Sequence, residues 1–278
     1  MRIPPRITQA VVVTILGAAT LFTLVVLVLI ILFILEKGLP VVGPGFLFSA
    51  PQDMGRAGGI FPTLVATIFL PLIAVSIAVP LGVGTAVYLT EYTRESPVTR
   101  IIRFGADCLA GIPSILFGLF GFIFFVTMLR MGWSLLSGGL TLALMILPTI
   151  IRTSEEAIRA VPDAYREVSF SLGATRFRTV RKVVLPNALP GIVTGVMLGI
   201  GRSIGETAAV IFTAGSSLRM PASVFDSART MSVHFYILAR EGISSENAYG
   251  TAAVLILSVL AINTVAYGLM NRFIKKQS

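Results

Sequence analysis

The chain has 278 residues, of which 55% are hydrophobic and 13% are charged, and its mean hydropathy is +0.90. These values exclude an ordinary soluble globular domain and predict a membrane protein. Cys108 is the one cysteine, so no internal disulfide can form. With His234 as the one histidine, a Cys/His metal site is strongly disfavoured, and we expect no bound metal.

Six apolar runs are long enough to cross a bilayer as helices, which takes roughly 20 residues each. They cover approximately residues 10–35, 61–89, 108–129, 134–151, 188–214 and 248–271. The first run is too long for a signal-peptide core, and no small-residue cleavage pattern follows it, so we expect a retained anchor. The sequence therefore predicts an all-α membrane protein with six transmembrane helices in a single domain, residues 1–278.

The basic residues are distributed unevenly among the loops. Of the 22 Lys and Arg, 15 lie before the first span, in loops 90–107 and 152–187, or after the last span. The positive-inside rule then places both termini and these two loops in the cytoplasm. The net charge of +9 is thus a topological signal, with membrane lipids as partner. We expect no nucleic-acid partner, because exposed aromatics do not alternate with the basic residues.

Glycine and proline mark several segments. Loop 36–60 is rich in both and should be irregular. Prolines at 62, 71, 80 and 148 free backbone carbonyls, so the second and fourth spans should face protein or a pathway rather than lipid alone. At the third span, where Cys108 is expected as small apolar filler at the helix start, Pro113 and Ser114 mark either a simple kink or a broken helix with amides facing a pathway.

The external segment 215–247 mixes charges of both signs. Its HFYILA stretch is too short to cross a bilayer, which predicts an interfacial or re-entrant helix. For His234 within this stretch, a packing or surface role is favoured over a pH-sensing role.

The sequence of the cytoplasmic loop 152–187 predicts ordered structure. Thr153 and Glu156 have capping-box spacing, so a helix should begin there. Pro162 and Gly173 are typical of the two ends of a short helix over about 162–172. Apolar positions at 177, 180 and 184 among basic residues then predict an amphipathic helix at the membrane surface. We therefore expect this loop to dock on a partner rather than to be only a solvated connection between spans.

The fifth span contains GIGRSIGETAAV, residues 199–210, with Arg202 and Glu206 inside an apolar segment. An Arg near the bilayer centre costs roughly 2.5–3.5 kcal/mol, so protein must shelter it. The i, i+4 spacing predicts that the two charges share one helical face and neutralise each other. Glycines at 191, 195 and 199 form a stripe that allows a neighbouring helix to approach closely.

Two roles are open for this charged pair. It can be an ion pair that only locks the helix to a partner. Alternatively, Arg202 lines a translocation path together with Ser203 and offers bidentate hydrogen bonds to an oxyanion. Glu206 then competes for the guanidinium and limits how long the anion stays bound. We favour the pathway role, with Pro113 and Ser114 as further candidates.

The common catalytic and nucleotide-binding motifs are absent from the sequence. None of the four lysines follows a glycine, so the phosphate-binding loop of P-loop ATPases is absent, and neither H-E-x-x-H nor G-x-S-x-G occurs. We therefore expect no catalytic residue and no cofactor in this chain. If ATP drives transport, a separate ATPase subunit must bind ATP and Mg.

The loop 152–187 resembles the EAA loop of permease subunits of bacterial ABC importers, whose pattern is E-A-A-x3-G-x9-I-x-L-P. Here the pattern reads Glu167-Val168-Ser169, three residues, Gly173, nine residues, then Val183-x-Leu185-Pro186. Val-Ser replaces Ala-Ala and Val replaces Ile, which keeps the small or β-branched character. The resemblance implies the type I ABC importer permease fold, N-in and C-in, and a coupling helix that sits in a groove of the ATPase subunit. The implied contacts are Tyr165, Arg166, Glu167, Ser171, Leu172, Gly173 and Ala174.

Segments 111–121 (GIPSILFGLFG) and 201–210 (GRSIGETAAV), and the run from MPASVFD to AYGTAAVLI, are similar to the A-type permease of phosphate (Pst) importers. This resemblance implies transport of inorganic phosphate across the cytoplasmic (inner) membrane of a prokaryote. It further implies a homologous C-type permease, a dimer of ATPase subunits and an extracytoplasmic phosphate-binding protein as partners. Sulfate, molybdate or tungstate remains an alternative cargo. An ATP-independent channel or an intramembrane scaffold is a further alternative.

Overall fold

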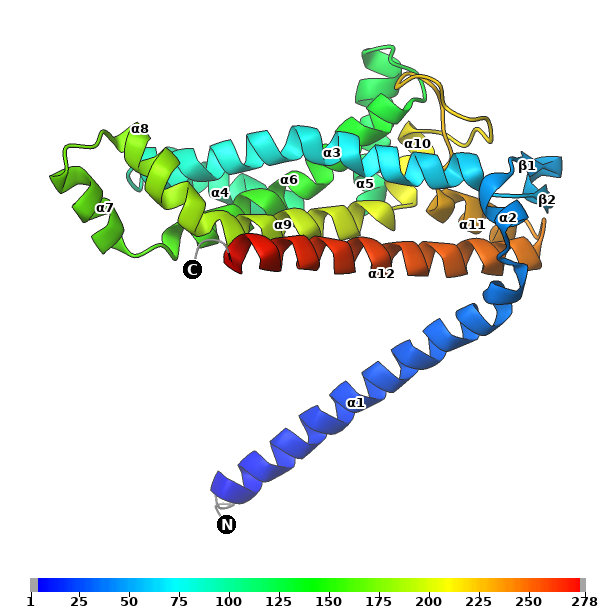
Figure 1. The fold of residues 1–278 in the computed structure, drawn as a ribbon, viewed down its shortest axis with the longest axis horizontal. Helices are drawn as coiled ribbons and strands as arrows, with labels where there is room; N and C mark the ends of the chain where they lie inside the picture. Colours follow the sequence, from blue (N-terminus) through cyan, green and yellow to red (C-terminus); the bar gives the residue numbers. More distant parts are fainter. Residues whose placement is uncertain (1–4, 276–278) are drawn as a thin grey trace.

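The computed structural model describes residues 5–275, and the side chains of residues 9, 11–265, 267 and 268. Within these residues five helices are long and apolar enough to cross a membrane, and a bent pair of helices makes a sixth if the pair counts as one span. The expected all-α membrane fold is confirmed. Figure 1 shows the start of α1, the end of α12 and helix α7 toward one end of the molecule, with α2 and α11 at the other. This is the arrangement expected when the start of α1 and the end of α12 lie on the side of α7.

Helix α1 (Pro5–Gly38) departs from the rest of the protein as a separate arm (Figure 1). Among the side chains that the structure describes, it meets α12 (Ser245–Lys275) toward its C-terminal end, where the Phe33 and Tyr249 rings stand edge to face with centroids 5.9 Å apart. A Cβ at Gly38 would overlap the backbone of Tyr249, so the absence of a side chain permits this contact. Most apolar side chains of residues 11–35 are exposed, and none of them is buried.

The loop after α1 consists of short pieces, as its Gly and Pro content predicts. They are η1 (Leu39–Val41), α2 (Pro44–Phe48), β1 (Pro51–Gln52), η2 (Asp53–Gly55) and β2 (Ala57–Gly58). The two strands pair antiparallel. Positive φ angles at Asp53, Met54, Gly55 and Gly58 turn the chain within this hairpin.

Three helices form the core of the protein. Helix α3 (Phe61–Val87), which ends in a π-helical turn (η3, Tyr88–Tyr92), packs on α6 (Leu135–Arg159), and α6 packs on α9 (Leu185–Ile204). The prolines at 62, 71 and 148 are buried among these helices, as expected, whereas Pro80 is exposed. Fully buried core side chains include Leu70, Leu142, Ile146 and Ile150.

The third expected span, 108–129, is wrong as a single helix. Helix α4 (Pro97–Ala110) begins with a capping box between Ser96 and Thr99, inside what was expected to be a loop. The chain then bends by 102° before α5 (Ser114–Gly121), which continues as a π-helical segment (η4, Phe122–Met128). Pro113 causes the break, because the residue before a proline avoids helical geometry. Cys108 is exposed near the end of α4 and not at a helix start.

The fourth span extends further than expected. Helix α6 continues to Arg159, so no helix begins at Thr153. The Thr153 hydroxyl donates to the carbonyl of Thr149, one turn earlier, at 2.8 Å. A Thr hydroxyl can bond to the backbone inside a helix as well as at its N-terminus. The capping-box spacing of Thr153 and Glu156 therefore does not by itself identify a helix start.

The glycine stripe of α9 packs on α6, as expected. A Cβ at Gly191 would lie 2.5 Å from the Ala157 methyl carbon, and a Cβ at Gly195 would overlap the Thr153 side chain. Gly199 faces Ile146. The two backbones therefore approach more closely than larger residues would allow.

The remaining elements lie at the two ends of the bundle. On one side are α7 (Asp163–Ser171), α8 (Arg176–Thr179) and a π-helical turn (η5, Val180–Val184). On the other are α10 (Ala208–Thr213) and the expected short helix α11 (Met231–Arg240). Within α11, His234 is buried against Gly55 of the hairpin, and its Nδ1 lies 3.4 Å from a guanidinium nitrogen of Arg229. The packing role expected for His234 is confirmed.

Replacing Gly195 with Ala should destabilise the protein by overpacking the contact with α6. The expected cost is about 1–3 kcal/mol, because Thr153 is held in a helix and cannot move aside freely. Thermal unfolding of the detergent-solubilised protein measures it. Gly84→Ala in α3 is the control, since a Cβ at Gly84 meets nothing within 4 Å. Equal melting temperatures for both variants would contradict the tight α6–α9 contact.

Acid should destabilise the packing of α11 through His234. Burial, and secondarily the positive charge of Arg229, lower the pKa of His234 from 6.5 to about 4. Between these two values the unfolded chain binds the extra proton and the folded chain does not, so stability falls as the pH falls through this window. Relative to a His234→Asn variant, the wild type should lose about 3 kcal/mol between pH 7 and pH 4. Unfolding curves of the two proteins that shift in parallel with pH would contradict this.

Candidate functional site

The fifth expected span is interrupted at the charged pair. Helix α9 ends at Ile204, and α10 begins at Ala208. Arg202 therefore lies in the last turn of α9, whereas Glu206 lies in the break, and the expected common helical face does not exist. None of the ion pairs between described side chains involves either residue. The expectation of mutual neutralisation on one helix is wrong, because the helix ends between the two charges.

Arg202 and Glu206 have different surroundings. The Arg202 side chain is exposed on the surface of this subunit. The Glu206 carboxylate accepts a hydrogen bond from the backbone N–H of Ala209 at 3.2 Å and so caps the first turn of α10. Ser203 is buried, and its hydroxyl donates to the carbonyl of Gly199 at 2.9 Å. Ser203 therefore supports the last turn of α9, while Arg202 is available to a partner or a solute.

Helix α11 holds the break in place from the external end. The Ser232 hydroxyl donates to the backbone carbonyl of Glu206 at 2.8 Å. At the start of the same helix, the N–H of Met231 donates to the hydroxyl of Thr67 in α3, also at 2.8 Å. Backbone groups freed by a break inside a membrane must find such partners. The break is thus a fixed feature of the fold and not a frayed helix end.

Helices α5 and α10 lie side by side. A Cβ at Gly118 would lie 2.9 Å from the Cα of Ala209, and a Cβ at Gly121 would lie 2.8 Å from the Thr213 methyl. The two helices therefore run in the same direction. One turn before Gly118 is Ser114, and about one turn before Ala209 is the α9–α10 break, so both helices begin at the same level.

The chain is thus broken at Pro113 and Ser114, with a bend of 102° between α4 and α5, whereas the expectation that the amides of α5 face a pathway stays a prediction. Pro113 is exposed and Ser114 is half-buried. The N-terminal N–H groups of α5 carry partial positive charge. N–H groups of this kind attract anions.

The expected coupling helix is present as α7, between Pro162 and Gly173. Gly173 has φ +78°, and the N–H groups of Gly173 and Ala174 donate to the carbonyls of Phe170 and Ser169 at 2.9 and 3.1 Å. This is the Schellman arrangement that ends a helix on a left-handed residue. The local signals that predict the ends of this helix are therefore confirmed.

Most of the expected coupling residues are exposed on α7 and the turn after it. Leu172 is 82% exposed. The exposed members of the expected set are Tyr165, Glu167, Ser171, Leu172 and Gly173, and Ala174 is half-buried. The apolar side chains of Val168 and Phe170 are also exposed, and the sequence pattern did not identify them.

Two members of the motif region point elsewhere. Arg166 is turned toward the permease itself, with a side chain only 15% exposed. Ser169 is buried, with its hydroxyl 2.8 Å from that of Thr179 in α8. The expected surface helix after α7 is wrong: Val180 and Val184 are buried and lead directly into α9, while Phe177 is exposed.

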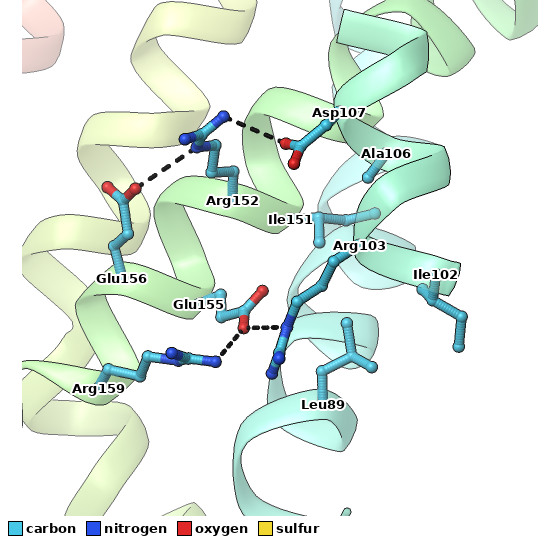
Figure 2. Close-up of a pocket in the computed structure, with 10 residues that line it drawn as sticks. All are labelled: Leu89, Ile102, Arg103, Ala106, Asp107, Ile151, Arg152, Glu155, Glu156 and Arg159. Carbon is cyan, nitrogen blue, oxygen red and sulfur yellow. Dashed lines mark hydrogen bonds and ion pairs between the residues drawn. The ribbon is translucent and has the colours of Figure 1, made fainter. Parts of the chain in front are cut away.

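A pocket of about 240 Å³ lies between α4 and α6 on the α7 side (Figure 2). In it the Glu155 carboxylate lies between the guanidinium groups of Arg103 and Arg159, at 2.8 and 2.7 Å. Arg152 similarly lies between Asp107 and Glu156. The sequence did not predict this cluster, because only the bend after α4 brings its residues against α6. Its charges are paired, so we assign it a structural role in placing α4.

The family described as "Binding-protein-dependent transport system inner membrane component" matches residues 78–278. A probable ABC transporter permease, YqgI of Bacillus subtilis, is 33% identical over 98% of both chains. The phosphate transport system permease PstA of Mycobacterium leprae is 34% identical over 78% of this chain and 72% of its own length.

Solved structures show the same fold. The MetNI methionine ABC transporter in an inward-facing form matches 77% of this chain and 94% of its own, with a TM-score of 0.61 and 22% identity. A bacterial ABC transporter that imports the polysaccharide alginate matches 96% and 99%, with a TM-score of 0.67 and 15% identity. The fold is therefore that of type I ABC importer permeases. The chain belongs to the inner-membrane component family of binding-protein-dependent transport systems, as the multi-pass permease subunit of an ABC transporter.

Proposed function

We propose that this permease carries inorganic phosphate across the cytoplasmic (inner) membrane of a prokaryote, in an importer driven by ATP. Relatives named PstA support this cargo, at 34% identity in Mycobacterium leprae and 30% in Xylella fastidiosa. The structural observation that carries the proposal is Arg202, exposed in the last turn of α9 just before the α9–α10 break. A cation at this place in a membrane subunit needs a partner that is not lipid.

The geometry suits an oxyanion that binds and then leaves. The guanidinium of Arg202 presents paired N–H groups that match two phosphate oxygens. The positive N-terminal end of α5, at Pro113 and Ser114, adds a weaker attraction. Glu206 already accepts one hydrogen bond from Ala209, and its negative charge opposes tight capture of an anion. Transport requires this balance, since a site that binds too tightly does not release.

The partners follow from the surfaces that one subunit leaves uncovered. The exposed Arg202 and the unpacked arm α1 fit a second, homologous C-type permease, with the pathway between the two subunits. The exposed apolar side chains of α7 fit the groove of an ATPase subunit, of which a dimer binds ATP and Mg. An extracytoplasmic phosphate-binding protein would deliver the anion at the end that carries α11. This chain then supplies no catalytic residue and binds no cofactor.

Another oxyanion is the second candidate. Sulfate, molybdate and tungstate also present paired oxygens to a guanidinium, and relatives of this fold carry cargo as different as methionine and alginate. The complex reconstituted with its binding protein distinguishes these cargoes. Phosphate should stimulate its ATPase activity, and stimulation by sulfate, molybdate or tungstate but not by phosphate would replace the proposed cargo.

Removing the guanidinium should impair phosphate uptake while the complex still assembles. Hydrogen bonds between charged groups contribute about 1.5–3 kcal/mol, so Arg202→Gln should lower uptake by roughly ten- to hundredfold. Arg202→Lys keeps the charge without the bidentate geometry and should fall between Gln and the wild type. Uptake of radioactive phosphate into proteoliposomes measures both.

The matched control is Arg219→Gln, which removes an exposed arginine from the external segment. Glu206→Gln tests the charge alone, because the amide oxygen can still accept from the N–H of Ala209. Unchanged uptake in both Arg202→Gln and Glu206→Gln, with assembly intact, would reduce these residues to a structural role.

Gly173→Ala should weaken docking of the ATPase subunit by loosening the end of α7. A Cβ at Gly173 meets nothing within 4 Å, so the cost is that of a left-handed residue alone, about 1–2 kcal/mol. Gly173→Asn should cost less, since Asn tolerates this conformation. Co-purification of the ATPase subunit with the permease measures the effect. Gly105→Ala is the control, because it also has open space but lies inside α4; an equal loss in both variants would contradict the prediction.

A further inference from the structure

Arg166 joins α7 to the body of the permease. Its Nη2 lies 2.7 Å and its Nε 3.1 Å from the same carboxylate oxygen of Glu91. Both side chains are largely buried, with 15% of Arg166 and 9% of Glu91 exposed. A shielded ion pair of this kind is weakly screened by salt, and removing one partner leaves the other without compensation.

The same guanidinium also contacts the end of α6. Nη1 donates to the carbonyl of Val161 at 2.7 Å, and Nη2 donates to the carbonyl of Ile158 at 3.0 Å. Carbonyls at the C-terminal end of a helix have no donor within that helix. The Ile158 carbonyl also accepts from the N–H of Val161 at 3.3 Å, and Val161 itself lies just beyond α6. Arg166 gives each carbonyl a further donor while it holds Glu91, so one side chain connects α7 with the ends of α3 and α6.

Glu91 occupies a special place in α3. It lies in the π-helical turn that ends this helix, where the N–H of Thr93 donates to the carbonyl of Tyr88, five residues earlier. Such turns are uncommon and are frequent at functional sites. The carboxylate that receives Arg166 is therefore carried by the last turn of a core helix and not by a loose connection.

We propose that the Arg166–Glu91 ion pair is the joint through which movement of α7 displaces α3 during transport. Arg166 is then a positioning residue that faces the permease, while its exposed neighbours on α7 face the ATPase subunit. This inference rests on the proposed docking of an ATPase subunit on α7. Without the joint, α7 can move with the ATPase while α3 stays behind.

Helix α3 leads from this joint to the candidate pathway. From Glu91 back to Thr67 it covers roughly 35 Å at 1.5 Å per residue. At that far end, Thr67 accepts a hydrogen bond from the N–H of Met231 in α11, and Ser232 of α11 donates to the carbonyl of Glu206. A rigid displacement of α3 therefore reaches the α9–α10 break beside Arg202.

The test uses the complete complex of this permease with its partner permease, ATPase subunits and binding protein in proteoliposomes. Three quantities are measured for Glu91→Gln, Arg166→Gln and the double variant: co-purification of the ATPase subunit, ATP hydrolysis, and phosphate imported per ATP hydrolysed. We expect co-purification and ATP hydrolysis to persist while phosphate imported per ATP falls by about fivefold or more. The double variant should be no worse than either single variant, because all three lack the same contact.

Asp163→Asn is the matched control. Asp163 also pairs with Arg166, at 3.1 Å, but it lies within α7 and is 89% exposed, so its loss leaves the joint to α3 in place. It should keep the wild-type ratio of phosphate to ATP. Should Glu91→Gln fail to assemble, Arg166→Lys serves instead, because an ammonium group cannot satisfy Glu91 and both carbonyls together.

The outcomes separate the two proposals. Loss of ATPase co-purification on Leu172→Ala or Gly173→Ala supports docking on α7, and full retention in both removes the basis for it. An unchanged ratio of phosphate to ATP in the Glu91 and Arg166 variants, with docking intact, overturns the joint. Equal loss of the ratio in Asp163→Asn also overturns it, since the contact with α3 would then not be the one that matters.

Discussion

Two interrupted helices inside a membrane protein impose the constraint on which the rest of this structure depends. The backbone groups freed between α4 and α5, and between α9 and α10, cannot be left facing lipid. The protein satisfies the second break with the Glu206 carboxylate on the N–H of Ala209 and with Ser232 on the Glu206 carbonyl. Close packing of α5 on α10 through Gly118 then brings the two helix starts together. The breaks, the small residues and the buried hydroxyl groups form one solution to one problem.

The same constraint explains why a single subunit is incomplete. Arg202 is exposed, and the described side chains of α1 are mostly exposed, with the Phe33–Tyr249 contact near the C-terminal end of the helix. A charged side chain and a long apolar arm can both be uncovered in one chain only if other subunits and lipid cover them. A family in which ABC permeases work with other subunits fits this need. The end of α9 that carries the exposed Arg202 therefore lies on the surface where the proposed pathway between subunits would form.

Local signals predicted the elements whose causes are local. Pro162 and Gly173 mark the two ends of α7, because the fixed φ of proline and the left-handed φ of glycine are properties of single residues. The glycines at 191, 195 and 199 predicted close packing of α9 on a neighbouring helix, because the absence of side chains lets another backbone approach. The resemblance to ABC importer permeases then identified the family, which the comparisons confirm.

What the sequence did not predict depends on contacts distant along the chain. Hydropathy treated residues 188–214 as one span, because a window of apolar residues does not register a break at Gly205 that α11 holds from outside. Thr153 has the spacing of an N-cap, yet in a continuous helix it donates to Thr149 instead. The bend after α4 brings Arg103 to Glu155, some fifty residues away in the sequence, and no local pattern announces such a pair.

Arg166 shows how a short motif can divide its work between two partners. Successive residues of an α-helix point about 100° apart, so Arg166 and Glu167 cannot face the same surface. In α7 the arginine is turned inward to Glu91, and the glutamate is exposed. A buried ion pair is costly to assemble, so a helix that only docked on another subunit would not require one on its inner side. The cost is intelligible if α7 has to be held on both sides, by the subunit that moves it and by the helix that it moves.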